Sequence, residues 1–223
     1  MSIGAESVNQ RKELTLKNIQ LFTLDFDGVV WGSELAIYEG VVEFHRHHGR
    51  EPPSFKEVWQ TMSAPYVVWW REREFMQPEE EIFAFVNRVA KSFPTGPKPD
   101  AIHLLEAAYR RKIPCYIVSA TSTDAINEKL ERSDLVDFVA GVFGHAEHNK
   151  AEMIRSACWT HNVALEDTVF IGDRPSDVRD GKEAGVYTVA YTGGHETHDF
   201  LTRAGPDHVT DDLRKLIPLF FGS

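Results

Sequence analysis

The sequence predicts an α/β fold with a mostly parallel, Rossmann-like sheet and a small helical-bundle domain inserted after the first strand. Three observations lead to this prediction. Short apolar runs alternate with longer segments of helical periodicity, and the runs are apolar on both faces, as parallel strands covered by helices are. One long stretch also shows helical patterns without a strand. The 223 residues are enough for a core domain that carries a smaller one.

The expected strands and helices alternate along most of the chain. In the segment 150–161, Met153, Ile154, Ala157 and Cys158 form an apolar stripe at helical spacing. The other helical segments are 100–111, 123–131, 176–184 and 211–220. The strand candidates are 21–28, 113–120, 138–144, 167–173 and 186–192.

The stretch from about residue 35 to residue 93 interrupts this alternation. Ser54 and Glu57 stand at capping-box spacing, and Pro78 precedes three glutamates at a second helix start. A Pro/Gly-rich segment, 94–100, follows. We therefore predict an α/β core of residues 17–33 and 97–223, a helical domain at 34–96, hinges near 31–34 and 94–99, and a loosely ordered segment at 1–16.

Composition excludes several classes of partner. The net charge of −10 lacks the basic footprint expected of a nucleic-acid-binding protein, and an anionic membrane surface would repel it. The first 20 residues have no signal-peptide core, and no run approaches the roughly 18 apolar residues of a membrane span. We expect a cytoplasmic protein in which Cys115 and Cys158 are buried, reduced thiols.

Polar residues follow the predicted strands at the points where four of them end. Ligands of open parallel sheets bind outside these carboxyl ends, so the side chains are expected to converge on one site. The residues are Asp25 and Asp27 after the first run, Ser119 after the second, Lys150 after the third, and Asp173 with Asp177 after the fourth.

Asp25 and Asp27 are the most informative pair. Residues two apart in an extended chain point the same way, so both carboxylates can reach a single site if the chain stays extended. Two such carboxylates are tolerated when a cation lies between them or one holds a proton. Gly28 then allows the backbone to turn and approach a ligand closely. A surface turn with two solvated acids is the alternative.

The polar residues at the later strand ends suggest binding sites for a metal ion and for an anion. Carboxylates from two strands suit Mg²⁺, which takes hard oxygen ligands. Asp177 also fits an ordinary place in the first turn of a helix that Ser176 caps. Lys150 opens a helix, where the helix dipole disfavours a cation, so a functional role is favoured over an exposed surface lysine. Ser119 can hold phosphate oxygens, although capping by Ser119, Thr121, Ser122 or Thr123 explains the same residues.

The order of these motifs resembles the haloacid dehalogenase superfamily, whose phosphatases carry the same four-part pattern. The matching residues are the DFDGV segment at 25–29, Ser119, Lys150 and the GDRPSD segment at 172–177. The C-terminal stretch from residue 185 also resembles the end of phosphoglycolate phosphatases. The helical insert falls where this superfamily places a helical cap between the first and second motifs.

The resemblance implies a Mg²⁺-dependent phosphatase that acts on a small phosphorylated metabolite, as a monomer or homodimer. Asp25 would be the nucleophile that forms an aspartyl-phosphate, and Asp27 the general acid and base. Mg²⁺ would be held by Asp25, the backbone carbonyl of Asp27 and Asp173, with support from Asp177. The phosphoryl group would be bound by Gly28, Ser119, Ala120 and Lys150.

Two residues of the motifs differ from the superfamily pattern, and several residues of the helical insert are candidates for contact with the substrate. Val29 stands where many relatives have Thr, and Arg174 either touches substrate phosphate or pairs with a nearby acid, the second being favoured. The 45–48 segment is expected at a solvated helix edge, 69–74 half in a core, and His195, Glu196 and His198 in a loop and helix start. Candidate selectors of substrate are His45, His47, His48, Lys56, Trp59, Trp69, Trp70, Arg71 and Arg73.

Other functions are also compatible with these motifs. A sugar phosphomutase uses the same motifs, and a phosphonate hydrolase needs a cap lysine such as Lys56. A dehalogenase usually lacks the second acid, so Asp27 argues against it. Outside the enzymes, a receiver-like domain or an inactive phosphate-binding protein would also gather acids and a lysine at strand ends. Receiver domains, however, are shorter and have no helical insert after the first strand.

Overall fold

The protein is described here by a computed structural model, which covers residues 19–63, 65–144, 149–193 and 197–222. The expectations for residues 1–16 and for His195 and Glu196 lie outside these residues. The strands form one six-stranded parallel sheet in the order β3-β2-β1-β4-β5-β6. They are β1 (Leu21–Leu24), β2 (Cys115–Ser119), β3 (Gly141–Gly144), β4 (Thr168–Gly172), β5 (Tyr187–Tyr191) and β6 (His208–Thr210).

The predicted fold class is confirmed, and five of the strands lie within the predicted runs. The last strand, β6, was not predicted. It has only three residues, two of them half-buried, and it lies at the edge of the sheet. A strand of this length shows too little periodicity to be recognised in the sequence.

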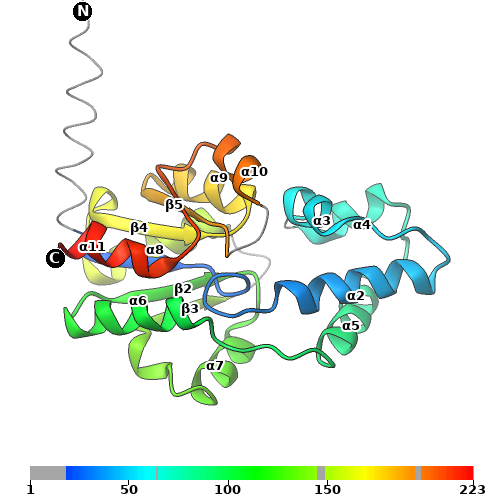
Figure 1. The fold of residues 1–223 in the computed structure, drawn as a ribbon, viewed down its shortest axis with the longest axis horizontal. Coiled ribbons are helices and arrows are strands. Elements are labelled where there is room, and N and C mark those ends of the chain that lie inside the picture. Colours follow the sequence, from blue (N-terminus) through cyan, green and yellow to red (C-terminus); the bar gives the residue numbers. More distant parts are fainter. Residues whose placement is uncertain (1–18, 64, 145–148, 194–196, 223) are drawn as a thin grey trace, which may run out of the picture.

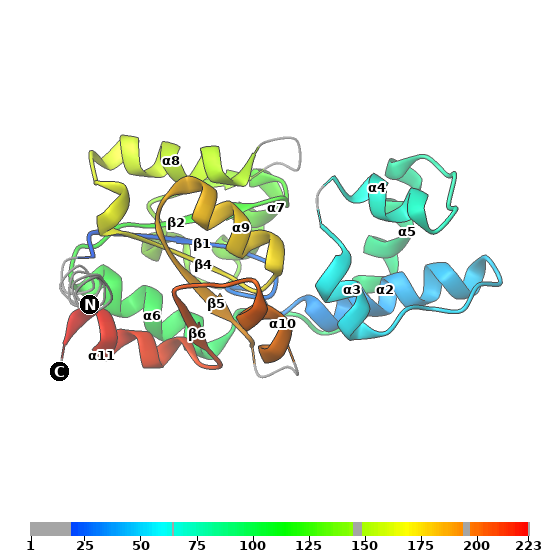
Figure 2. The same ribbon diagram turned by 90° about the horizontal axis from the view of Figure 1, so that it is seen from above.

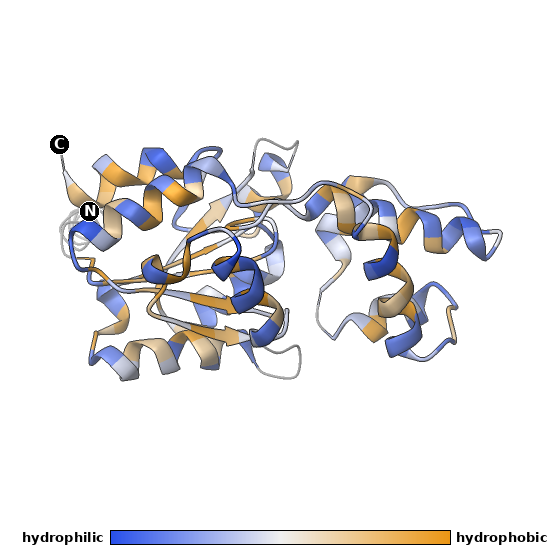
Figure 3. Cartoon of the chain, turned by 90° about the horizontal axis from the view of Figure 1, so that it is seen from below, coloured by the Kyte–Doolittle hydropathy of each residue, from blue (hydrophilic) through white to orange (hydrophobic). Residues whose placement is uncertain are grey.

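Helices cover both faces of the sheet (Figure 2). One apolar cluster joins the sheet to α6 (Pro99–Arg110), α7 (Thr123–Glu131) and α11 (Leu216–Phe221). Another joins its other face to α8 (Lys150–His161) and α9 (Pro175–Ala184). Figure 3 shows the hydrophobic strands between helices whose outer faces are hydrophilic. The remaining elements of this part are α10 (His198–Arg203) and three short 3-10 turns, η2 (Val136–Phe138), η3 (Leu165–Asp167) and η4 (Leu213–Lys215).

The inserted stretch forms four helices, which we call the helical module: α2 (Glu34–His47), α3 (Phe55–Thr61), α4 (Tyr66–Glu72) and α5 (Glu79–Ala90). The described part of residues 34–90 contains no strand, as predicted. Ser54 caps α3 by accepting the Glu57 N–H at 3.2 Å. The module lies beyond the carboxyl ends of the strands (Figure 1).

Two chain segments connect the helical module to the sheet, and they run side by side. The Gly32 N–H donates to the Gly96 carbonyl at 2.8 Å, and the Lys98 N–H donates to the Val30 carbonyl at 2.9 Å. The Lys98 ammonium also forms a 2.6 Å ion pair with Glu34. The two segments occupy the predicted hinges, while the division into a core and a cap domain stays a prediction.

Several smaller expectations can be compared with the structure. Cys115 and Cys158 are buried and free, as predicted. Trp69 and Trp70 are buried next to exposed residues, which confirms the half-core interpretation of that segment. The interpretation of 45–48 as a solvated edge is wrong for His45, which is buried against Phe75 and both tryptophans. Among the described helices, none has the length and apolar character to cross a bilayer.

Candidate active site

The candidate site lies where the strand order of the sheet reverses direction. The central strand β1 has β2 on one side and β4 on the other, which makes this the switch point at which open α/β sheets bind ligands. Leu24 pairs with Ile171 at the ends of β1 and β4, and the Asp25 N–H donates to the Ile171 carbonyl at 2.9 Å. Asp25 and Asp173 therefore leave adjacent strands at nearly the same level.

Three buried carboxylates converge at this point. Asp25, Asp173 and Asp177 each offer an oxygen, and these oxygens lie within 4.8 Å of one another. Oδ1 of Asp173 is buried and has no hydrogen-bond partner among the described residues. A buried oxygen of this kind needs a partner, and clustered carboxylate oxygens are the donors that Mg²⁺ takes. The residues present therefore fit a divalent cation.

Lys150 brings positive charge to the same cluster from the first turn of α8. Its Nζ lies 2.7 Å from Oδ1 of Asp177 and 3.2 Å from Oδ2 of Asp25. These two carboxylates raise the pKa of Lys150 although burial opposes the charge. The lysine stays charged as a result. The functional role favoured for its position is consistent with these contacts, and an exposed surface lysine is ruled out.

Asp177 supports the loop that carries Asp173. Its Oδ2 accepts the backbone N–H of Asp173 at 3.1 Å and that of Arg174 at 3.0 Å. The first residue of α9 is Pro175, so Arg174, and not Ser176, occupies the N-cap position. The predicted capping by Ser176 is wrong, because proline at the first helical position places the serine inside the first turn.

The carboxylates next to the switch point have altered acidity in the absence of a cation. Burial raises the pKa of Asp173 to about 8, although Arg174 opposes this rise. The pKa of Asp25 is raised to about 6, chiefly by burial, with Lys150 lowering it and Asp177 raising it. Both shifts disfavour the charged form, so a cation that restores the charged form would be bound at the expense of protons.

Asp27 lies close enough to Asp25 for its charge to raise the pKa of that carboxyl, and its predicted roles stay predictions. The strand ends at Leu24 and the chain turns, so the Asp27 side chain does not join the three clustered carboxylates. Instead it accepts from the Ser33 hydroxyl at 2.6 Å and from the Thr121 hydroxyl at 2.5 Å. Lys129 lies 3.9 Å away. The condition under which both side chains would point to one site, an extended chain, is not met, because a turn follows β1.

Gly28 is required by the closeness of the two loops. Its φ is +86°, which non-glycine residues rarely adopt, and a Cβ atom there would lie 2.1 Å from Oδ2 of Asp173. The glycine of the DFDGV segment therefore lets the first loop pass directly against the Asp173 carboxylate. Binding of phosphate by Gly28 stays a prediction.

Ser119 and Ala120 lie at the end of β2. Ser119 is buried, and its hydroxyl oxygen accepts the Thr121 N–H at 3.2 Å. Ala120 is half-buried. The N-cap of α7 is Ser122, which forms no side-chain cap. Binding of a phosphoryl group by Ser119 and Ala120 stays a prediction.

The helical module also reaches the acid cluster. Nε1 of Trp59 donates to Oδ2 of Asp173 at 2.7 Å, so one of the candidate selectors contacts the core. Arg174 donates to the Met62 carbonyl at 2.7 Å and lies 4.1 Å from the centre of the Trp59 ring. The hydrogen bond of its guanidinium thus goes to the module, while its positive charge opposes the rise in the pKa of the neighbouring Asp173.

Tyr66, at the start of α4, was missed by the sequence analysis. Burial raises the pKa of its phenol, and the charges that act on it are those of Arg174, Lys150, Asp25 and Asp177. The phenol therefore lies near the acid cluster although it belongs to the helical module. Its sequence signal, an aromatic residue after Pro65, does not distinguish it from the core aromatics around it.

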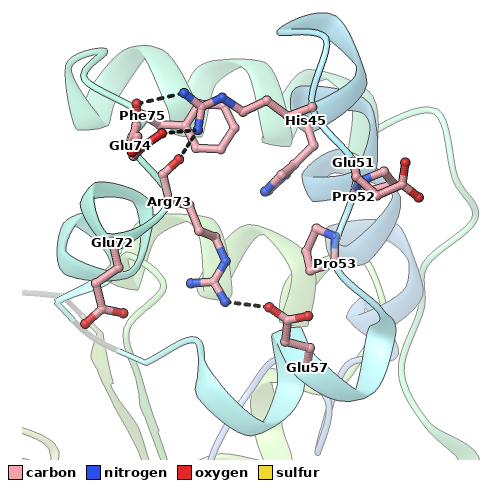
Figure 4. A pocket seen from close by; sticks show the side chains of 10 residues that line it. His45, Glu51, Pro52, Pro53, Glu57, Glu72, Arg73, Glu74 and Phe75 are labelled. Carbon is pink, nitrogen blue, oxygen red and sulfur yellow. Dashed lines mark hydrogen bonds and ion pairs between the residues drawn. The ribbon is translucent and has the colours of Figure 1, made fainter.

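Most other candidate selectors lie away from the acid cluster. His45 and Arg73 line a separate hollow of about 620 Å³ inside the helical module, where Arg73 pairs with Glu57 at 2.7 Å (Figure 4). Arg71 donates to the Gln77 carbonyl at 3.0 Å. Lys56 and His47 are exposed, and His48 is half-buried. These contacts stabilise the module itself.

A model of the haloacid dehalogenase-like hydrolase family matches residues 22–191. Because this range covers most of the chain, the protein belongs to that family. A pyrophosphatase from Oceanobacillus iheyensis is 21% identical over 170 residues, which make up 74% of this chain and 73% of that protein. A candidate phosphoglycolate phosphatase from Pseudomonas savastanoi is 43% identical over 56 residues.

That second match covers 25% of this chain and spans only 35% of the length of the Pseudomonas protein. Among solved structures, a candidate beta-phosphoglucomutase from Bacteroides vulgatus is similar to this chain with a TM-score of 0.72 and 17% identity. The match covers 94% of this chain and 95% of the other. At this identity the structure shows a shared fold. The family match over residues 22–191 makes the protein a haloacid dehalogenase-like hydrolase. Its two named relatives are a pyrophosphatase and a candidate phosphoglycolate phosphatase.

Proposed function

We propose that the protein is a Mg²⁺-dependent phosphatase that hydrolyses the phosphate monoester of a small metabolite. The observation that carries this proposal is the cluster of Asp25, Asp173 and Asp177, buried within 4.8 Å of one another beside Lys150. Phosphoryl transfer depends mainly on positioning and on positive charge around the phosphoryl oxygens. This cluster supplies a carboxylate nucleophile, a cation and oxygen ligands for a second cation.

Asp25 and Asp173 would hold Mg²⁺ through their carboxylates, together with the backbone carbonyl of Asp27. The bound ion would neutralise the phosphoryl oxygens and remove the repulsion between Asp25 and an anionic substrate. Asp177 is already bonded to Lys150 and to two backbone N–H groups. Its part is therefore to hold the Asp173 loop and Lys150 in place.

The reaction proceeds in two steps. In the first, a carboxylate oxygen of Asp25 forms a bond to phosphorus, the bond between phosphorus and the leaving oxygen breaks, and Asp27 gives that oxygen its proton. In the second, Asp27 takes a proton from water, whose oxygen bonds to phosphorus and releases phosphate and the Asp25 carboxylate. The Ser33 and Thr121 hydroxyls donate to Asp27 and thereby orient its carboxylate.

Lys150 would hold the phosphoryl oxygens, with Ser119 and with backbone groups of Gly28 and Ala120. Lys150 is well placed for this, because it stays charged and lies 3.2 Å from the nucleophile. The helical module would act as a cap that excludes water and contacts the leaving group. In support of this role, Trp59 donates to Asp173, and the charges of Asp25, Asp177 and Lys150 act on Tyr66.

A phosphomutase is the second candidate, since a structure assigned to that activity shares the fold over 94% of this chain. A mutase would return the phosphoryl group to another hydroxyl of the same substrate instead of to water. The phosphonate hydrolase is disfavoured, because Lys56, the cap lysine it would need, is exposed on α3.

The test is a panel of phosphorylated metabolites assayed with Mg²⁺ and with chelator, followed by identification of the products. We expect phosphate release that depends on Mg²⁺ and that Asp25→Asn abolishes. Turnover that survives unchanged in Asp25→Asn or in chelator would contradict the proposal. An isomeric phosphate ester without free phosphate would identify the mutase instead.

A further inference from the structure

Two side chains join the helical module to the acid cluster. Trp59 in α3 donates its indole N–H to Oδ2 of Asp173, and this 2.7 Å contact is buried. Arg174, the next residue after Asp173, donates to the Met62 carbonyl at the end of the same helix. Both contacts therefore fasten α3 to the loop that carries a proposed metal ligand.

The contact of Trp59 controls which oxygen of Asp173 is available. Oδ2 is engaged by the indole N–H and lies against Gly28, whereas Oδ1 is buried without a partner among the described residues. A hydrogen bond to one oxygen fixes the rotation of a carboxylate and leaves the other oxygen for a ligand. Trp59 thus engages Oδ2 and leaves Oδ1 as the oxygen that a cation could take.

Arg174 in turn holds the indole in place. Its guanidinium lies 4.1 Å from the centre of the Trp59 ring, and the Phe55 ring stacks on Trp59 at 4.8 Å with an angle of 8° between the planes. A planar guanidinium stacks on an aromatic ring while its N–H groups bond elsewhere, which a lysine does not reproduce. Arg174 combines this stacking with the bond to Met62.

We propose that Trp59 and Arg174 are positioning residues that couple the seating of the helical module on the core to the binding of a divalent cation at Asp173. This inference rests on the proposed function. With the module seated, the indole N–H orients the carboxylate; with the module displaced, that hydrogen bond is lost. Because coupling between two equilibria is reciprocal, a bound cation stabilises the seated module by the same factor.

The test is calorimetric titration of the full chain with Mg²⁺ in the absence of substrate. Trp59→Phe keeps an aromatic ring but lacks the N–H, and we expect it to weaken Mg²⁺ binding on the order of tenfold. Trp69→Phe is the matched control, because the indole N–H of Trp69 donates to Thr61 inside the module at 2.8 Å and not to Asp173. Its Mg²⁺ affinity should equal that of the wild type.

Arg174→Lys tests the second residue with the charge retained. The retained charge matters because removal of a cation next to Asp173 would by itself favour Mg²⁺. We expect Arg174→Lys to weaken Mg²⁺ binding, and Arg71→Lys, whose arginine bonds within the module, to leave it unchanged. The double variant Trp59→Phe/Arg174→Lys should lose less than the product of the two single effects, since both act through one contact.

Hydrogen exchange supplies a readout that does not depend on affinity. Mg²⁺ should slow amide exchange in 55–62 of the wild type, although that segment contains no proposed metal ligand, and should not do so in Trp59→Phe or Arg174→Lys. If Trp59→Phe does not fold, as judged by circular dichroism without metal, the exchange result for Arg174→Lys decides.

The outcomes separate this inference from the proposed function. Equal Mg²⁺ affinities of wild type and Trp59→Phe, or tighter binding by the variant, would overturn the coupling and leave the phosphatase proposal in place. Tighter binding would mean that the indole competes with the cation. A folded wild type that binds no Mg²⁺ would contradict both the coupling and the proposal of a Mg²⁺-dependent phosphatase.

Discussion

The Nζ of Lys150 lies 3.2 Å from Oδ2 of Asp25, although α8 and β1 are far apart in the sequence. The same Nζ lies 2.7 Å from Asp177, so one partly buried cation contacts two buried carboxylates. Such an arrangement is strongly destabilised when one partner is removed, because the remaining charges stay out of water.

We therefore expect Lys150→Met to lower the free energy of unfolding by about 3–5 kcal/mol in chelator. Urea denaturation measures this change. The matched control is Lys182→Met, because Lys182 pairs with Asp207 at 3.5 Å in a half-exposed position. That variant should lose less than about 1 kcal/mol. Similar losses in the two variants would contradict the role of Lys150 in the cluster.

Asp27→Asn tests the division of labour between the two acids of the first loop. The Ser33 and Thr121 hydroxyls that donate to Asp27 remain, so the variant should fold normally. We expect turnover of an alkyl phosphate to fall by about 10²–10⁴-fold, because the leaving oxygen is no longer protonated.

With p-nitrophenyl phosphate, whose leaving group needs no proton, the first turnover of Asp27→Asn should survive as a rapid burst of nitrophenol. Rapid-mixing absorbance detects this burst. A variant that loses the burst to the same extent as it loses alkyl phosphate turnover would not support an acid role for Asp27.

The pKa values of Asp25 and Asp173 predict how Mg²⁺ and pH are linked. In the metal-free chain burial raises them to about 6 and about 8, above the ordinary value of 3.8. A carboxyl whose pKa is raised by folding favours the folded state at low pH and loses that contribution as pH rises through the folded value. In the metal-free chain, the free energy of unfolding that these two carboxyls contribute therefore falls between about pH 4 and about pH 8.

Mg²⁺ restores the ionised form, so the rise in Tm that it causes should grow from about pH 5.5 to about pH 8. Thermal melts with and without Mg²⁺ across this range measure the difference and cancel the titration of other groups. Asp173→Asn should remove most of the pH dependence. A Mg²⁺-induced shift in Tm that is constant with pH would show that these carboxyls do not exchange protons for the ion.

Gly28→Ala examines the contact between the loop that follows Asp25 and the loop that carries Asp173. The new Cβ would lie 2.1 Å from Oδ2 of Asp173, on a backbone with φ of +86°. We expect loss of Mg²⁺ binding by calorimetry, because either the first loop or the Asp173 carboxylate must move. Gly96→Ala is the control, since a Cβ there meets nothing within 4 Å. Unchanged Mg²⁺ affinity in Gly28→Ala would place the metal away from Asp173.

The sequence predicted the fold class and the convergence of Asp25, Lys150, Asp173 and Asp177, because strand ends of a parallel sheet share one edge. It did not predict where Asp27 points, since this side chain accepts from Ser33, six residues further on, and from Thr121 in a distant segment.

The contacts between the helical module and the core could not be predicted from the sequence either. The bond from Trp59 to Asp173 and the position of Tyr66 depend on how two packed units meet, which no local periodicity encodes. The same holds for Arg174, whose side chain reaches the Met62 carbonyl across that junction. Local pattern thus identified the acids of the core, whereas the residues that reach them from the module emerged from tertiary packing.

The central claim is that Asp25 carries the phosphoryl group, and one trapping experiment tests it most directly. The enzyme is quenched with acid during turnover of a phosphate ester, reduced with borohydride and digested for peptide mass spectrometry. Because borohydride reduces an acyl phosphate but not a free carboxylate, we predict homoserine at position 25 and an unmodified Asp27. Homoserine at another aspartate, or an unmodified Asp25 under conditions in which the intermediate accumulates, would contradict the account.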